Sequence, residues 1–271
     1  MTADGGNGRL RVTGAVPVTP RMLRVSAVME APHLSVDISC PNLILRLTPP
    51  AEGNGHVVGA ARPPSRTYTI RRYDAGTSSL DIDVVLHGDG PFVRWALAAR
   101  AGDTIDFTGP RPHAVPSPGA ETWLMFADES GLPALASILE SAPAGLPVMA
   151  WIEVAGAAEE QPIASAADVR IQWLQRHDAP AGTTGALERV ARECDWPADP
   201  VEVWVACEAG ETRAIRRFAS AERGVDRDHV HAFGYWRLGR SGSLAAGDRL
   251  RAVRLDSVRG GGYRPLRARR S

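Results

Sequence analysis

The segment "RTYTIRR", from Arg66 to Arg72, decides how the first half of this 271-residue chain is interpreted. It has the Thr and Tyr content of a β-strand, yet three of its seven residues are arginine. A solvent-exposed edge strand carries such residues without any function, and this is the simplest interpretation of the segment alone. A strand that presents one polar face to a ligand has the same composition, so the neighbouring sequence has to decide between the two.

Short alternating runs surround this segment as far as about residue 112, and Gly, Pro and Asn separate them. The runs are "LRVTGAV", "RMLRVSAV", "NLILRLT", "LDIDVVLHG" and "DTIDFTG". Strands of this length between turn residues predict an antiparallel barrel or sandwich, interrupted by one helix-like run, "FVRWALAAR". The Gly- and Pro-rich stretch from Glu52 to Pro64 is expected to be a loop.

The pattern changes after a Pro-rich connector, "RPHAVPSPGA", which runs from Arg111 to Ala120. Apolar strand-like runs now alternate with helical runs, as in "TWLMFA" followed by "GLPALASILE". This alternation predicts a parallel sheet covered by helices on both faces. The expected fold class is therefore β + α/β, with an antiparallel barrel in residues 1–114, an α/β domain in residues 119–240 and an Arg- and Gly-rich tail in residues 241–271.

The composition excludes several classes of function. The 31 basic residues balance 31 acidic residues, so no overall field would hold nucleic acid or an acidic membrane. No run approaches the roughly 20 consecutive apolar residues that cross a bilayer, and the N-terminus lacks a signal-peptide pattern, so we expect a cytoplasmic protein. Cys40, Cys194 and Cys207 suit neither a disulfide framework nor a thiolate zinc site. Since the sequence contains no lysine, a Schiff base and a P-loop lysine are ruled out.

The run "LHGDGPFVRWALAAR" predicts a site for a phosphate group. A strand is expected to end at His87, followed by a tight turn and a helix that starts near Pro91 or Phe92. Backbone amides and the positive end of the helix dipole would then point at one place. If the "RTYTIRR" strand lies alongside, Arg66 adds a guanidinium and Tyr68 a flat ring face. Together these features suit a dinucleotide with a planar end.

Six motifs resemble, in their order and spacing, those of the siderophore-interacting proteins, a branch of the ferredoxin-reductase-like flavoproteins. They are "RTYTIRR", "LDIDVVLHGDGPFVRWA", "AGDTIDFTGP", "ADESGLPALASILE", "ACEAGETRAIRRF" and "FGYWRLG", and they cover about residues 9–240. The resemblance implies a Greek-key barrel that binds FAD, an α/β domain that receives NADPH or NADH as electron donor, and reduction of a ferric siderophore with release of iron.

The resemblance assigns the R-x-Y-T motif to Arg66, Tyr68 and Thr69. Arg66 would contact the FAD pyrophosphate, Tyr68 would lie on the isoalloxazine ring, and Thr69 would hydrogen-bond the flavin. The strand at 66–72 would then be polar because one of its faces is a cofactor site.

The following turn and helix correspond to a second flavin contact in the family. His87 would approach the FAD phosphates or the adenine, and the amides near Gly90, Pro91 and Phe92 would lie by the pyrophosphate. Trp95 would pack behind them. For His87, a histidine satisfied at a strand end is an equally good interpretation.

In the second half, "ADESGLP" corresponds to the family's Asp-Glu-Thr motif, so Asp128, Glu129 and Ser130 are candidates to line the nicotinamide side. The alternative is that Asp128 or Ser130 only caps the following helix. The arginines of "ETRAIRRF", Arg213, Arg216 and Arg217, are either donors to an adenosine 2'-phosphate or the solvated side of a helix.

The "GYWR" signature of the family falls on Tyr235, Trp236 and Arg237. These residues would lie near the flavin and the substrate entrance, with Arg237 a contact for an anionic ferric chelate. No catalytic acid, base or nucleophile is identified. The pair His229 and His231 is too small a signal for a metal site, and the oligomeric state stays open.

The sequence departs from the family pattern at three positions that bear on function. Phe92 and Val93 replace a small residue and a hydroxyl, so that Phe92 is expected to add bulk beside the FAD. Cys207 replaces a glycine, and its side chain is expected to narrow the nicotinamide site. These departures support a second hypothesis, a biosynthetic enzyme on the same scaffold that retains FAD but not nicotinamide-driven ferric reduction. A module that binds a chelate without turnover is a third.

Overall fold

The structure is a computed structural model, and it describes residues 6–30, 40–50, 65–198 and 200–239. The expected loop at 52–64 and the expected tail at 241–271 lie outside the described residues.

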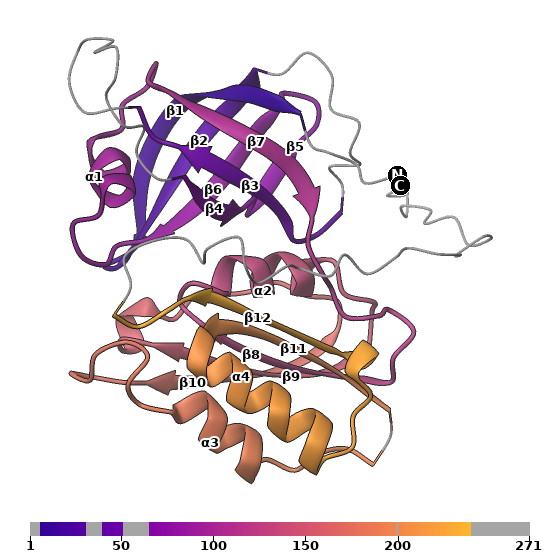
Figure 1. Cartoon of the computed structure of the whole chain (residues 1–271). Coiled ribbons are helices and arrows are strands. Elements are labelled where there is room, and N and C mark those ends of the chain that lie inside the picture. Colours follow the sequence, from indigo (N-terminus) through magenta and orange to yellow (C-terminus); the bar gives the residue numbers. More distant parts are fainter. Residues whose placement is uncertain (1–5, 31–39, 51–64, 199, 240–271) are drawn as a thin grey trace.

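The first half of the described chain is an antiparallel seven-stranded sheet with the order β4-β3-β7-β1-β2-β6-β5 (Figure 1). Its strands are β1 (Asn7–Thr19), β2 (Met22–Glu30), β3 (Leu43–Thr48), β4 (Arg66–Thr69), β5 (Arg72–Asp74), β6 (Ser79–Val85) and β7 (Thr104–Pro112). One helix, α1 (Pro91–Ala98), joins β6 to β7. The predicted antiparallel barrel with a single helical interruption is confirmed.

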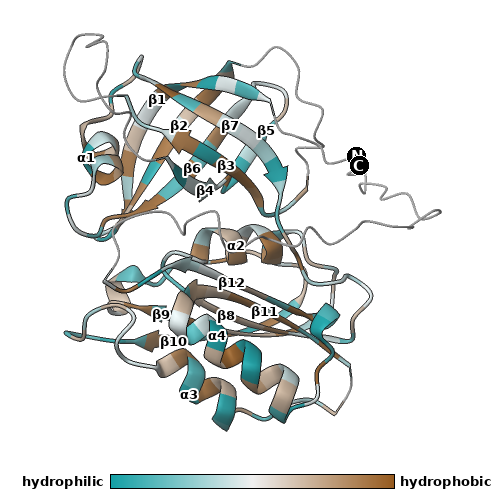
Figure 2. Ribbon diagram, in the orientation of Figure 1, coloured by the Kyte–Doolittle hydropathy of each residue, from teal (hydrophilic) through white to brown (hydrophobic). Residues whose placement is uncertain are grey.

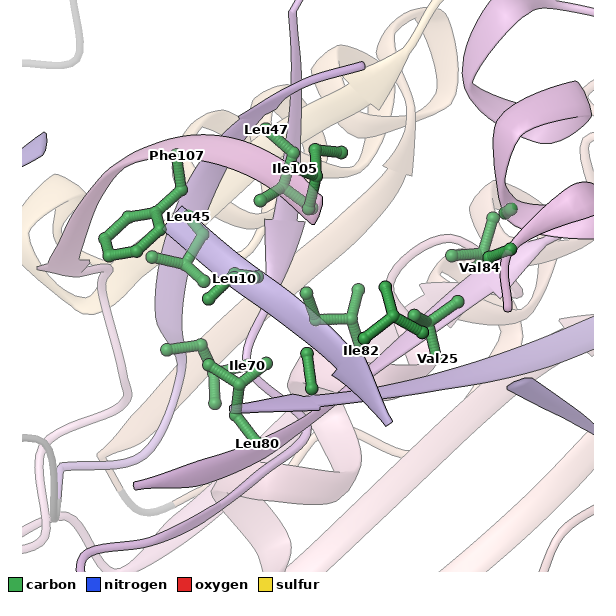
Figure 3. Close-up of a cluster of buried hydrophobic side chains, with 14 of the residues drawn as sticks. Leu10, Val25, Leu45, Leu47, Ile70, Leu80, Ile82, Val84, Ile105 and Phe107 are labelled. Atoms are coloured by element: carbon green, nitrogen blue, oxygen red, sulfur yellow. The ribbon is translucent and has the colours of Figure 1, made fainter. Parts of the chain in front are cut away.

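The chain after β4 closes this sheet into a barrel. The Ile70 N–H donates to the carbonyl of Leu43 in β3, and the Arg71 N–H donates to the carbonyl of Asp81 in β6. Successive residues of this bent segment therefore pair with β3 and β6, near opposite ends of the strand order, which leaves fewer unpaired backbone groups. Alternate side chains fill the interior, as Figure 3 shows for ten labelled residues.

The second half is a five-stranded parallel sheet with the order β10-β9-β8-β11-β12. Its strands are β8 (Thr122–Asp128), β9 (Pro147–Val154), β10 (Asp168–Gln175), β11 (Val201–Glu208) and β12 (Val230–Trp236). The helices are α2 (Leu132–Glu140), α3 (Ala186–Glu193) and α4 (Ala209–Arg217), with short helical turns η1 (Ala157–Glu159), η2 (Phe218–Glu222) and η3 (Arg227–His229). The predicted parallel α/β sheet is confirmed.

Helices cover both faces of the parallel sheet, as predicted. Leu135 and Ile138 of α2 pack in one core, and Leu187 of α3 and Ile215 of α4 pack in the other. Figure 2 shows hydrophobic residues concentrated along the strands and on the inner sides of the helices. Every residue of β8 and β11 is buried, because these strands have neighbours on both edges and helices on both faces.

Helix α2 lies between the barrel and the parallel sheet (Figure 1). Glu140 at its end accepts two hydrogen bonds from Arg71, at 2.7 and 2.6 Å, and the hydroxyl of Ser137 accepts one from the Asn42 N–H at 3.1 Å. A further bond joins Thr19 to Glu159 at 2.5 Å. The barrel strands are thus tied directly to the α/β layer. No helix within the described ranges combines the length and apolar character needed to span a bilayer.

Candidate functional site

Two segments far apart in the sequence, β4 and the start of α1, lie against each other. The rings of Tyr68 and Phe92 stack with centroids 4.3 Å apart and an interplanar angle of 25°. Tyr68 is directly opposite Leu45 of β3, whose side chain lies in the barrel core, so Tyr68 and Arg66 project on that side of the sheet. Burial raises the pKa of the Tyr68 phenol, and the charge of Arg66 opposes that rise. The structure therefore brings an aromatic ring to the start of a helix, with Arg66 on the same side of β4 as that ring.

The start of α1 has the features of an anion site. Strand β6 ends at Val85 rather than at the expected His87, because the chain already turns at Gly88, which has a φ of 61°. His87 is exposed. Gly90 precedes the helix without a side-chain cap, and the first turn contains no acidic residue. A Cβ at Gly88 or Gly90 would meet no atom within 4 Å, so a phosphate can approach the backbone amides here.

The side chains of Phe92 and Val93 point inward from this helix. They are 5% and 6% exposed, and together with Ala96 they form the buried face of α1. Phe92 was expected to place bulk beside a bound FAD, and most of its ring packs into the end of the barrel. Trp95 packs against Phe92, with ring centroids 5.3 Å apart, and is itself partly buried.

Thr69 lies on the opposite face of β4 from Tyr68, towards the α/β sheet. It is 7% exposed, and its hydroxyl lies beside that of Tyr235 at a geometry that falls short of a hydrogen bond. The Tyr235 hydroxyl is buried and has no hydrogen-bond partner in the part of the chain that the structure describes. His113 packs between Phe233 and Tyr235, and burial lowers its pKa to about 4. The candidate residues of both halves of the chain therefore meet at this junction.

Asp128 ends β8 and uses both carboxylate oxygens. One accepts hydrogen bonds from the backbone N–H groups of Ser130 and Gly131 at 2.8 and 3.3 Å, and from the Ser130 hydroxyl at 2.5 Å. The other accepts from the Trp236 indole at 2.7 Å. Burial raises the pKa of Asp128, although these bonds oppose the rise. The alternative assignment of Asp128 as a cap for the turn into α2 thus has direct structural support, and the same side chain holds the "GYWR" segment in place.

The carboxyl edge of the parallel sheet is rich in carboxylates. Glu129 forms an ion pair with Arg176 at 2.8 Å, and Glu153 accepts a hydrogen bond from Thr184. Burial raises the pKa of Glu153, and it raises the pKa of Glu211 to about 7. One guanidinium nitrogen of Arg176 is buried and lacks a hydrogen-bond partner among the described residues. This edge therefore combines several buried acids with a guanidinium whose hydrogen bonds are only partly satisfied.

Sequence reasoning missed three residues of this edge, Glu153, Arg176 and Glu208. A signal existed for two of them, because Glu153 and Glu208 lie at the ends of predicted strands, where parallel sheets place their ligand-facing groups. Arg176 directly follows β10 and carried no comparable signal.

Cys207 does not narrow the edge of the sheet, contrary to the expectation. The residue is fully buried in the core between the sheet and α4, and its Sγ lies 3.3 Å from the Thr212 hydroxyl. Burial raises the pKa of this thiol well above its ordinary value. The exchange of glycine for cysteine is accommodated inside the fold.

The remaining candidate cations differ in position. Arg237 is half-buried, and its Nε has no hydrogen-bond partner in the described ranges. Arg216 and Arg217 lie in the last turn of α4, at the end away from the carboxyl edge, and both are exposed. Arg213 is exposed and lies nearer the start of that helix. The solvated interpretation therefore suits Arg216 and Arg217.

Two family models match the chain. The siderophore-interacting FAD-binding domain matches residues 39–114, and the siderophore-interacting protein model matches residues 120–239.

Two relatives of this chain from different organisms carry reductase names. The ferric acinetobactin reductase of Acinetobacter baumannii is 34% identical over 78% of this chain and 71% of its own length. The ferric vibriobactin reductase of Vibrio cholerae is 32% identical over 73% of each chain.

Solved structures agree with the fold. A siderophore utilization protein from T. fusca aligns with a TM-score of 0.76 at 35% identity, over 88% of this chain and 95% of that one. The siderophore-interacting protein of Acinetobacter baumannii aligns with a TM-score of 0.75 at 27% identity, over 88% and 92%. A ferredoxin reductase in carbazole 1,9a-dioxygenase aligns with a TM-score of 0.65 at 16% identity, which supports the fold alone.

The barrel, the parallel sheet, the two model matches and the relatives agree, and the chain belongs to the siderophore-interacting protein family.

Proposed function

We propose that this protein is an FAD-containing oxidoreductase that reduces a ferric siderophore, with NADPH or NADH as the electron donor, and so releases iron. The observation that carries the proposal is the stacking of Tyr68 on Phe92 at the uncapped start of α1, with Arg66 on the same side of β4 as Tyr68. The names of the reductase relatives and the FAD-binding family model support the same class of function.

The donor set at the junction fits FAD. A pyrophosphate needs a cation and backbone amides, and Arg66 and the amides after Gly90 supply these groups. A flavin ring needs an apolar, planar contact, and Tyr68 offers the part of its ring that Phe92 does not cover. The polar edge of the ring needs hydroxyl or amide partners, and Thr69 and the unpaired Tyr235 hydroxyl lie together at the junction.

When bound, FAD would accept a hydride from the nicotinamide and pass single electrons to the iron of the chelate. The residues of the chain bind and orient the reactants. Thr69 and Tyr235 would fix the flavin edge from the two sides of the junction. Trp236, held by Asp128, and Arg237, with its unpaired Nε, would shape the entrance and contact an anionic chelate. A lysine-free chain has to make that contact with arginine.

A second candidate function has specific support in the carboxylates of the sheet edge. Asp128, Glu153 and Glu211 lie at the carboxyl edge of the parallel sheet, where α/β folds bind their ligands. Burial raises the pKa of all three groups, and the ionised form of each would repel a phosphate. This arrangement favours an enzyme that retains FAD but acts on an organic substrate without nicotinamide-driven reduction.

One experiment separates the two functions. The purified protein is loaded with FAD, its visible spectrum is recorded under anaerobic conditions, and NADPH or NADH is added, followed by a ferric siderophore. Bleaching by a nicotinamide and reoxidation by the chelate are expected for the reductase. A yellow protein that neither nicotinamide bleaches would support the second function. A protein that does not take up FAD would contradict both.

A further inference from the structure

An aromatic stack runs from α1 to β4 and ends at the surface of the proposed flavin site. Trp95 contacts Phe92, and Phe92 stacks on Tyr68 with centroids 4.3 Å apart. Phe92 is 5% exposed and lies at the end of the barrel interior, among apolar side chains such as Val84 and Ile105. Tyr68, in contrast, is only partly buried. Phe92 is therefore the buried middle ring of this group, and Tyr68 is the partly accessible ring on the barrel strand.

Phe92 restricts the orientation of the Tyr68 ring. Strand β4 has only four residues, and its other edge has no paired strand in the described sheet, so the backbone alone constrains Tyr68 weakly. Near-parallel contact with a buried ring of α1 favours one orientation of the phenol, since offset stacking of two aromatic rings is stabilising. Exposure of the Tyr68 ring is therefore confined to the part that Phe92 leaves uncovered.

We propose that Phe92 is a positioning residue that holds the Tyr68 ring as a preformed stacking platform for the flavin. The inference rests on the proposed FAD site and deepens it. A residue that preorganises a contact ring reduces the ordering that binding would otherwise require. Phe92 takes a position that is small in the family pattern, so this backing ring is a property of this chain's own sequence rather than of the shared motif.

The expected effect follows from the loss of one aromatic contact. Replacing Phe92 by Leu keeps an apolar side chain in the barrel but removes the ring that stacks on Tyr68. A stacked pair contributes enough free energy that FAD affinity should fall by about two- to tenfold. The fluorescence of bound FAD should also rise, because a tyrosine that is free to tilt quenches the flavin less than one held parallel to it.

The test compares Phe92→Leu with Phe107→Leu by FAD titration and by fluorescence of the bound flavin. Phe107 is a buried phenylalanine of the same core, and its ring does not stack on Tyr68, so the exchange controls for loss of core packing. Thermal unfolding of each FAD-free variant measures that loss separately. Phe92→Met serves as a second variant if Phe92→Leu does not fold.

The proposal expects weaker FAD binding and brighter bound FAD for the Phe92 variant, and values within about twofold of wild type for Phe107→Leu once stability is accounted for. Equal behaviour of the two variants would overturn the positioning role and leave the FAD site intact. Tighter FAD binding by Phe92→Leu would show that Phe92 obstructs the flavin, which also overturns the role. If the wild-type protein takes up no FAD, the proposed function itself fails, and the inference with it.

Discussion

Replacing Glu140 by Gln would remove the charge that neutralises Arg71 at the junction of barrel and α/β sheet. Arg71 follows Thr69 by two residues, so the ion pair anchors the candidate site strand to helix α2. The two groups form a bidentate pair, with Nη–Oε distances of 2.7 and 2.6 Å. The Arg71 side chain is only 6% exposed.

The loss of stability expected for Glu140→Gln depends on which other charged groups surround Arg71. The nearest other carboxylate is Asp83, whose oxygen lies 3.9 Å from Arg71 Nε and already pairs with Arg24 at 2.7 Å. Removing one partner of a fully buried pair costs about 3–5 kcal/mol. The Glu140 side chain is 26% exposed, so water compensates part of that loss. Because Gln also keeps a hydrogen-bond acceptor, we expect Glu140→Gln to lower the free energy of unfolding by about 2 kcal/mol.

The assay is urea unfolding at pH 7, followed by tryptophan fluorescence and far-ultraviolet circular dichroism. Glu30→Gln is the matched control, because it breaks a surface pair with Arg11 whose partners are 43% and 48% exposed. Such a pair contributes at most about 1 kcal/mol. A Glu140 variant that loses no more stability than the control would refute the reasoning.

The pH dependence gives a second check on the same variant. Burial alone would raise the pKa of Glu140, but the hydrogen bond and charge of Arg71 outweigh it and hold the pKa below its ordinary value. A carboxyl group with a lowered pKa in the folded state stabilises above its unfolded pKa and loses that effect as the pH falls through the folded pKa. The difference between wild type and Glu140→Gln should therefore be full at pH 7 and should shrink under acid conditions.

Three further outcomes follow from the structure. Arg66→Ala should weaken FAD binding by about tenfold or more in a flavin fluorescence titration, because a charge-assisted contact is lost. The control variant Arg100→Ala, at the other end of α1, should bind FAD as wild type does. Equal FAD affinities of all three proteins would contradict the site. Glu202→Gln should lower the thermal unfolding midpoint more at pH 5.5 than at pH 8.5, because the hydrogen bond to Glu202 raises the pKa of His229. A raised histidine pKa stabilises the fold at low pH, and this stability is lost as the pH rises through the pKa of the folded state. A loss of stability that does not depend on pH would argue against this pair. Gly131→Ala should lower the thermal unfolding midpoint by several degrees, because the new Cβ would lie 2.1 Å from the Ala206 carbonyl oxygen. A midpoint equal to that of wild type would show that β11 can shift with no loss of stability.

The fold could be predicted from local patterns, because each half has its own period. Alternating runs with turn residues gave the barrel, and strand runs followed by helical runs gave the parallel sheet. The contact between Tyr68 and the start of α1 was expected only if the two segments lie side by side. The stacking of the Tyr68 and Phe92 rings shows that they do.

Long-range pairing set the limit of sequence reasoning. The pairs Arg71–Glu140 and Thr19–Glu159 join residues 69 and 140 positions apart, and no local pattern specifies which acid meets which donor. The inward direction of Phe92 was open to prediction, since positions 92, 93 and 96 share the buried face of one helix. The resemblance to the family instead places position 92 on the ligand side of the helix. The burial of the Cys207 side chain could not be predicted, because it depends on β11 being covered on both faces, and only the assembled sheet shows this.

Hydrogen–deuterium exchange with and without FAD tests the flavin site most directly, because it locates the ligand on the chain. We expect FAD to slow amide exchange in residues 66–70 of the barrel and 88–95 around the start of α1. Exchange in helix α3, which lies on the face of the parallel sheet away from the barrel, should stay unchanged. Protection confined to other segments, or none at FAD concentrations that saturate the visible spectrum, would contradict the placement of the flavin on β4 and α1.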